Sequence, residues 1–219
     1  IRQFASSDDV AIVVDYVHGS TRGRPRTILG EKARLIELRT EDNYLFGGVA
    51  PEPTAKNMAG VVEELSKRKE RFKIGVIFDP DGDRIRFADE KKQISMDQFG
   101  AMALHYLYKE RGLRGVLAKS VATSNFGNAI AEKLGIPIAE TSVGFKNFRP
   151  YLTPGANPMA IVAYEESDGI SGYNNTLEKD AQFGLLIAIE MVARLQISLS
   201  DYLHQLQEEF GYFYSERLG

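Results

Sequence analysis

The sequence contains no cysteine among its 219 residues, and neither sign of charge predominates. Without cysteine there can be no disulfide bond, no zinc site with thiolate ligands and no thiol nucleophile. The 27 basic and 30 acidic side chains give a net charge of −3. Because the two signs are mixed along the chain, no electrostatic footprint for nucleic acid or anionic lipid is present. We therefore expect neither a nucleic-acid partner nor a membrane partner.

Long hydrophobic runs are also missing. The most apolar segment, residues 181–195, is shorter than the roughly 20 residues of a membrane span and is interrupted by Glu190 and Arg194. We interpret it as a buried helix. The chain begins with Ile1 and has no basic-then-apolar leader. We expect a piece of a longer cytoplasmic polypeptide.

The chain has the composition of a folded protein. Apolar residues make up 43% of it and charged residues 26%, which allows one large domain or two of ordinary size. Continuous apolar runs predict strands buried on both faces, and segments of helical period separate them. The strands are expected at residues 10–14, 73–78, 85–88, 136–139 and 160–163, and the apolar helix faces at 58–65, 99–107 and 126–134. This alternation predicts the α/β class, with mixed, mostly parallel sheets flanked by helices.

The alternation restarts once, near residues 94–97, after a charged turn at 89–92. Ser95 followed by Gln98 is typical of a capping box that begins a helix, and Gly135 is placed to end a later helix. We therefore predict two consecutive domains, residues 1–95 and 96–210, each of a common domain size.

The loop from Asp79 to Arg84, with the sequence Asp-Pro-Asp-Gly-Asp-Arg, has the strongest chemical signal. In an extended segment, side chains at i, i+2 and i+4 point to one side, so Asp79, Asp81 and Asp83 converge. Three carboxylates this close repel one another unless a cation neutralises them. Oxygen ligands without His or Cys favour Mg²⁺ or Mn²⁺, and Arg84 adds a donor suited to phosphate. We predict a magnesium site.

Two other interpretations of this loop compete with the magnesium site. Asp and Gly are common in solvated turns, but a buried strand directs this loop to the edge of a sheet where ligands bind. A calcium-binding EF-hand begins with the same aspartate spacing. It requires Gly where Arg84 stands and helices where strands are predicted.

The loop resembles the metal-binding loop of the α-D-phosphohexomutases, the phosphoglucomutase and phosphomannomutase superfamily. Glu165-Glu166-Ser167 is similar to the sugar-binding loop of that family, although Tyr164 stands where the family often has Gly. Weaker similarities occur in the expected order at residues 15–19, 51–53 and 141–146. The resemblance implies the second and third of four domains, with residues 211–219 beginning a linker to the missing fourth.

By this resemblance, the intact enzyme is a magnesium-dependent phosphoprotein that moves phosphate between C1 and C6 of a hexose phosphate through a bisphosphate. The missing first domain supplies the phosphoserine, and the missing fourth a phosphate-binding loop. The resemblance assigns Arg84, Lys146 and Lys119 to phosphate contact or proton transfer. It assigns Glu165, Ser167 and Gly144 to substrate binding and Asp79, Asp81 and Asp83 to Mg²⁺.

Two further functions stay open. In an aspartyl-phosphate phosphatase, Asp79 would be the nucleophile and Asp81 the acid. That class expects Thr or Val after the Gly, where Asp83 and Arg84 follow here. The other possibility is a non-catalytic core that binds metal and sugar phosphate. The sequence does not distinguish glucose from mannose or glucosamine phosphates, since these differ at C2 and that position is recognised by a geometry that the sequence does not show.

Overall fold

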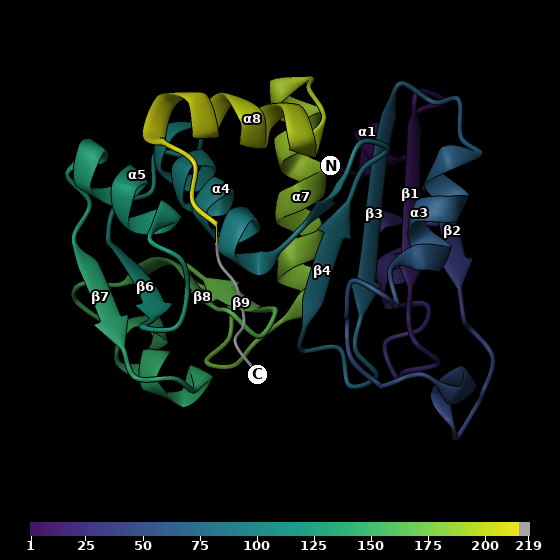
Figure 1. The fold of residues 1–219 in the computed structure, drawn as a ribbon, viewed down its shortest axis with the longest axis horizontal. Helices are drawn as coiled ribbons and strands as arrows, with labels where there is room; N and C mark the ends of the chain where they lie inside the picture. Colours follow the sequence, from purple (N-terminus) through teal and green to yellow (C-terminus); the bar gives the residue numbers. More distant parts are fainter. Residues whose placement is uncertain (215–219) are drawn as a thin grey trace. The chain divides into compact units, whose positions relative to one another are not determined.

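The computed structural model describes residues 1–214 and separates into two compact units. The first contains Ile1–Ile94 and Ala181–Asp201, and the second contains Ser95–Asp180 and continues from Tyr202. Each unit has its own sheet (Figure 1). The α/β class with mixed sheets flanked by helices is confirmed. The predicted domain bounds stay a prediction, and the expected linker lies largely outside the described residues.

The first unit is built around a five-stranded sheet with the order β2-β1-β3-β4-β5. Strand β1 is parallel to β2 and β3, while β4 and β5 continue the sheet antiparallel. The elements are α1 (Arg2–Ala5), β1 (Val10–Asp15), α2 (Arg24–Leu29), β2 (Leu35–Leu38), the 3-10 helix η1 (Phe46–Gly48), α3 (Ala59–Ser66), β3 (Phe72–Phe78), β4 (Ile85–Ala88), β5 (Gln93–Ile94) and α7 (Ala181–Leu195).

Close approach of helix α3 to the sheet forms the first core. All six residues of β1 are buried, as the continuous apolar run predicts. A Cβ at Gly75 would lie 2.5 Å from Val61, so only glycine lets α3 lie this close to β3. Of the expected apolar face of α3, Val62 is 38% exposed and lies outside the core. Helix α7 packs on β3 and β4, so it belongs to this unit although it follows the second sheet in sequence.

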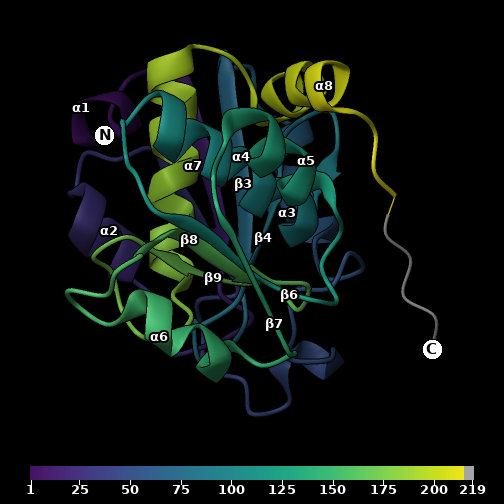
Figure 2. The same cartoon turned by 90° about the vertical axis from the view of Figure 1, so that its left-hand side faces the viewer.

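The second unit has a four-stranded sheet with the order β7-β6-β8-β9 (Figure 2). Strands β7 and β8 are parallel to β6, and β9 is antiparallel to β8. The elements are α4 (Met96–Lys109), β6 (Val116–Ser120), α5 (Phe126–Leu134), β7 (Ile138–Thr141), the 3-10 helix η2 (Phe145–Phe148), α6 (Arg149–Leu152), β8 (Ala160–Glu165), β9 (Gly169–Gly172) and α8 (Leu199–Phe210). The first three residues of α8 are grouped with the first unit.

Several local predictions for the second unit are confirmed. The Ser95 N–H donates to the Gln98 side chain at 3.3 Å in the predicted capping box, and Gly135 ends α5 with φ +67°. One strand is shifted, because β7 begins at Ile138 and not at residue 136. Pro137 has no N–H to donate to the sheet, which explains the later start.

Neither unit contains a single helix that is long and apolar enough to cross a membrane, within residues 1–214. The bent pair of α7 and α8 meets the criterion of length and composition only when both are taken together. Most of α7 is buried, which confirms the interpretation of residues 181–195 as a buried helix.

Candidate functional site

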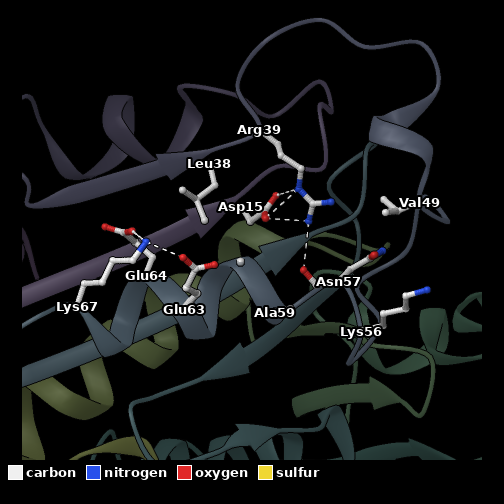
Figure 3. Close-up of a pocket in the computed structure, with 11 residues that line it drawn as sticks. Asp15, Leu38, Arg39, Val49, Lys56, Asn57, Ala59, Glu63, Glu64 and Lys67 are labelled. Atoms are coloured by element: carbon white, nitrogen blue, oxygen red, sulfur yellow. Dashed lines mark hydrogen bonds and ion pairs between the residues drawn. The ribbon is translucent and has the colours of Figure 1, made fainter.

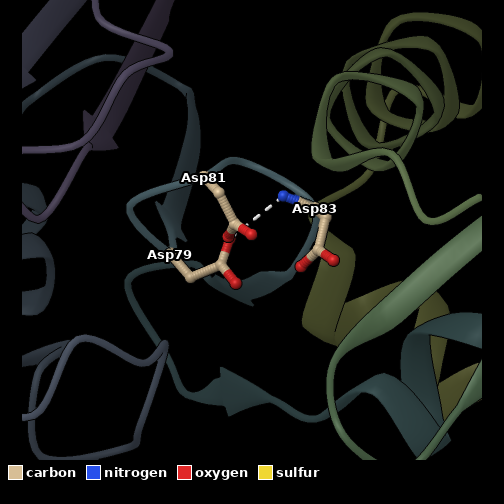
Figure 4. Close-up of side chains that lie close together, drawn as sticks. All are labelled: Asp79, Asp81 and Asp83. Carbon is tan, nitrogen blue, oxygen red and sulfur yellow. Dashed lines mark hydrogen bonds between the residues drawn. The ribbon is translucent and has the colours of Figure 1, made fainter.

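The acidic loop follows β3 directly and is organised by its first aspartate. Oδ1 of Asp79 accepts hydrogen bonds from the backbone N–H groups of Gly82, Asp83 and Arg84, each at 3.0 Å. Because three donors converge on one oxygen, the loop curls around this carboxylate (Figure 4). Asp79 is 4% exposed. Its other oxygen, Oδ2, lies 3.6 Å from Arg84 Nε.

The three aspartates meet in space. One oxygen each of Asp79, Asp81 and Asp83 lies within 4.8 Å of the others. Asp79 is buried, Asp83 is half-buried and Asp81 is exposed, so the cluster opens to solvent on one side. Three carboxylate oxygens with an open side suit Mg²⁺, which keeps several positions for water or a phosphate oxygen.

The pKa of Asp79 is raised to about 7, chiefly by burial, with a smaller contribution from the neighbouring acids Asp83 and Asp81, while the backbone donor of Arg84 acts to lower it. Near neutral pH, a proton and a metal cation therefore compete for this carboxyl group. The donor set and its charge thus fit a divalent metal ion.

Residues 19–21 support the loop from the end of β1. A Cβ at Gly19 would lie 2.4 Å from the backbone of Pro80, and the Ser20 N–H donates to the Pro80 carbonyl at 2.7 Å. Gly82 has φ +77°, and a Cβ there would lie 2.0 Å from Thr21. The Thr21 hydroxyl is buried at this contact without a hydrogen-bond partner in the described chain. Glycine is required at both positions for the loop to close.

Arg84 lies among the acids of its own loop. Its Nε is 3.6 Å from Asp79 and 3.7 Å from Asp83, and Nη1 is 3.8 Å from Glu52. The Nε atom makes no hydrogen bond in the described residues, and the side chain is 34% exposed. The guanidinium therefore remains able to donate to an oxyanion beside the carboxylate cluster.

In the second unit, Glu165 ends β8 and is 4% exposed. Residues 166–168 form a turn with Asp168 at φ +68°, so Ser167 lies in a turn directly after the strand. Glu166 accepts a hydrogen bond from the Ser120 hydroxyl.

The structure adds Lys179, which sequence analysis missed. Its Nζ lies 3.8 Å from Glu165 Oε1 and 5.9 Å from the ring centre of Phe145. The residue stands in the charged stretch Glu178-Lys179-Asp180, which has the pattern of a solvated turn. Only the return of the chain to the end of β8 brings the two charges together.

The remaining predicted residues occupy very different surroundings. Lys119 is 0% exposed in β6, and its Nζ is 2.9 Å from Glu140. Lys146 is exposed on η2 and forms no ion pair within residues 1–214. Gly144 has φ +113° where η2 begins, a conformation that favours glycine.

These features define an α/β protein with a cluster of three carboxylates, able to hold a metal ion, at the end of a buried parallel strand. Residues 2–92 match the family model for phosphoglucomutase/phosphomannomutase alpha/beta/alpha domain II, and residues 95–210 match that for domain III. The chain belongs to the phosphoglucomutase/phosphomannomutase family, which confirms the resemblance seen in the sequence.

Individual relatives agree with this assignment. Phosphoglucomutase 1 of Drosophila melanogaster is 26% identical over 99% of this chain and 42% of its own length. A crystal structure of pp63/parafusin, a phosphoglucomutase from Paramecium, superposes with a TM-score of 0.79 at 24% identity, covering 96% of this chain and 39% of that one. A structure of the N-acetylphosphoglucosamine mutase of Aspergillus fumigatus with GlcNAc-6P and magnesium gives 0.63 at 14% identity, covering 93% and 51%. The chain spans less than half the length of the fly relative.

Proposed function

We propose that this chain is the metal- and sugar-binding part of a phosphohexomutase, which moves a phosphoryl group between C1 and C6 of a hexose phosphate through a bisphosphate intermediate. The observation that carries the proposal is the convergence of three aspartate oxygens within 4.8 Å in a chain of this family. Residues 1–95 would form the metal-binding domain and residues 96–210 the sugar-binding domain.

Asp79, Asp81 and Asp83 would hold Mg²⁺, which when bound neutralises charge on a transferring phosphoryl group. The relative from Aspergillus, whose structure contains magnesium and GlcNAc-6P, supports this choice of metal and substrate class. Arg84 would donate to a phosphate oxygen from beside the cluster. The backbone donors on Asp79 fix the loop before any ligand arrives, so little reorganisation is needed.

Glu165, Ser167 and Gly144 would bind the sugar, and Lys146 would contact phosphate or move a proton. A buried carboxylate accepts hydrogen bonds from sugar hydroxyls strongly, since no water competes for it. Lys179, at 3.8 Å, would pair with Glu165 and hold its side chain in place at the end of β8. Lys119 could act on substrate only by leaving Glu140, so we assign it to supporting the end of β6.

The remaining steps would need residues outside this chain. A phosphoserine and a phosphate-binding loop would come from the rest of the polypeptide, as the family resemblance implies. The isolated chain is then expected to bind Mg²⁺ and hexose phosphate without isomerising it.

Calorimetric titration with Mg²⁺ tests the proposal. Asp81→Asn should weaken binding at least tenfold, because it removes an exposed ligand without disturbing the buried part of the loop. Glu31→Gln, an exposed acid distant in sequence from the loop, is the matched charge control and should leave affinity unchanged. Equal affinity in all three proteins would refute the metal site.

An aryl phosphate assay separates the proposal from the phosphatase alternative. Sustained Mg²⁺-dependent release of phosphate that disappears in Asp79→Asn would identify Asp79 as a nucleophile and contradict the mutase proposal. No turnover is expected.

A further inference from the structure

The first unit contains a cavity of about 490 Å³ that the proposed function does not use (Figure 3). It lies beside Asp15 and Leu38, the last residues of the parallel strands β1 and β2, and Ala59 and Gly60 of α3 line it as well. The carboxyl edge of parallel strands is where open α/β sheets bind ligands. The volume is within the range of small-molecule sites.

An arginine is held in a fixed orientation in this cavity. Nε and Nη2 of Arg39 donate to the Asp15 carboxylate at 2.7 and 2.8 Å, and Nη2 also donates to the Asn57 carbonyl at 3.3 Å. Asp15 is 2% exposed and the Arg39 side chain 22%, so the carboxylate is buried while the guanidinium reaches the cavity. Arg39 has φ +48°, a conformation costly for a residue with a Cβ, and such strain is concentrated at functional sites.

Two cationic groups in the cavity have donors to spare. Nη1 of Arg39 and the Lys56 ammonium have no hydrogen-bond or ion-pair partner within residues 1–214. Figure 3 shows the third guanidinium nitrogen of Arg39 directed away from Asp15, toward the side where Val49 and Lys56 lie. With Asp15 neutralising Arg39, the positive charge of Lys56 leaves this end of the cavity with a net charge of +1.

Apart from Asp15, which is paired with Arg39, the acids of the cavity lie away from these donors. Glu63 and Glu64 both pair with Lys67, at 2.9 and 3.3 Å, at the other end of the cavity (Figure 3). The wall between the two ends is open, because a Cβ at Gly60 would meet only Leu38, at 4.0 Å. An anionic group is therefore favoured at one end, and there is room for an uncharged part beside it.

We propose that this cavity binds a small organic anion. Its carboxylate or phosphate group contacts Arg39 Nη1 and Lys56, and its uncharged part lies against Leu38 and Val49. Asp15 is the positioning residue that holds Arg39 in place. The site is independent of the metal loop and does not depend on the mutase proposal.

The test is an amide NMR titration of the whole chain with inorganic phosphate and, separately, with acetate. EDTA excludes binding through a divalent ion, and chloride keeps the ionic strength constant. We expect saturable shifts at the amides of Arg39 and Gly60, with a Kd of about 1 mM for at least one anion. Lys56→Ala should weaken binding at least fivefold. Lys69→Ala, an exposed lysine outside the cavity, should not change it.

Gly60→Leu places a side chain in the cavity and should abolish saturation. If that variant unfolds, Gly60→Ala replaces it: its methyl group fits without a clash and still occupies part of the cavity, so binding should be weaker than in the wild type. Saturation by only one of the two anions supports the proposal and identifies the group bound. Shifts that rise linearly with both anions, or equal effects of Lys56→Ala and Lys69→Ala, would overturn it.

Discussion

Tyr164 of β8 and Gly127 of α5 should show strong energetic coupling between the second sheet and the helix that contacts it. Tyr164 immediately precedes the candidate sugar ligand Glu165, and its ring lies in a slot between helices α4 and α5. A Cβ at Gly100 of α4 would lie 2.4 Å from the ring, and one at Gly127 of α5 would lie 2.2 Å from the hydroxyl. That hydroxyl is buried without a hydrogen-bond partner in the described chain. Two glycines thus make room for one tyrosine.

Two substitutions and their double variant allow the energetic effect of this contact to be estimated. Tyr164→Phe removes an unsatisfied hydroxyl and should stabilise the unit by about 1 kcal/mol. Gly127→Ala gains about 0.5–1 kcal/mol from helix propensity, but overpacking against the hydroxyl costs about 1–3 kcal/mol. In the double variant the closest atoms would be Leu117 at 3.3 Å and the ring carbon at 3.4 Å, so most of that cost disappears. We expect a coupling energy of about 1–3 kcal/mol.

Native-state hydrogen exchange at the amides of β6 and β8 is the suitable assay, since a chain of two compact units need not unfold in one step. Gly127→Ala should lower protection in the wild-type background and leave it unchanged or higher in Tyr164→Phe. Equal loss of protection in both backgrounds would refute the steric argument. Gly135→Ala, at φ +67° with open space around it, is a control whose cost should not depend on residue 164.

Three further predictions concern titration and the loop. Because the pKa of Asp79 is raised to about 7 and its ionised form binds metal, Mg²⁺ affinity measured by calorimetry should fall about tenfold from pH 8 to pH 6; constant affinity would contradict this. Burial lowers the pKa of His105, whose Nδ1 is 2.6 Å from the Tyr202 hydroxyl, so the contribution of neutral His105 to stability should be fully present above about pH 6.5 and decrease as the pH falls below it. In His105→Gln, the free energy of unfolding measured with urea should depend less on pH in this range. Gly82→Ala should abolish Mg²⁺ binding, because alanine disfavours the positive φ at this position and its Cβ would clash with Thr21. If the amide spectrum shows that the variant is unfolded, the glycine is required for folding and not specifically for the metal site.

The metal loop could be predicted from sequence because its geometry is local. Asp79, Asp81 and Asp83 lie within five consecutive residues, and the backbone donors that organise them come from the same segment. The convergence that the spacing indicated is therefore found in the structure. The need for glycine at positions 19 and 82 could not be predicted from the sequence. The contacts of Gly19 with Pro80 and of Thr21 with Gly82 join segments about 60 residues apart.

The second unit shows the opposite case, in which contacts distant in sequence decide the surroundings of a residue. Nothing in the sequence separates Lys119 from Lys146, yet Lys119 is buried against Glu140 and Lys146 is exposed. Lys179 had no signal of its own, because it follows β9 and meets its partner Glu165 only where the chain returns to the end of β8. A charged residue in a strand reveals its role only when its neighbour across the sheet is known.

Asp79 shows how one side chain can serve both the fold and the site. Its Oδ1 accepts from three backbone donors of the curled loop, of which the Gly82 N–H also donates to the Asp79 carbonyl, while Oδ2 faces Arg84 at 3.6 Å. Asp79→Asn should therefore keep much of the loop, since the amide oxygen can accept the same bonds, and lose the charge that a metal requires. Asp79→Ala should lose both. Comparing the amide spectra of the two variants, with Mg²⁺ binding absent in each, separates the structural oxygen from the ligand oxygen; identical spectra would show that Oδ1 does not organise the loop.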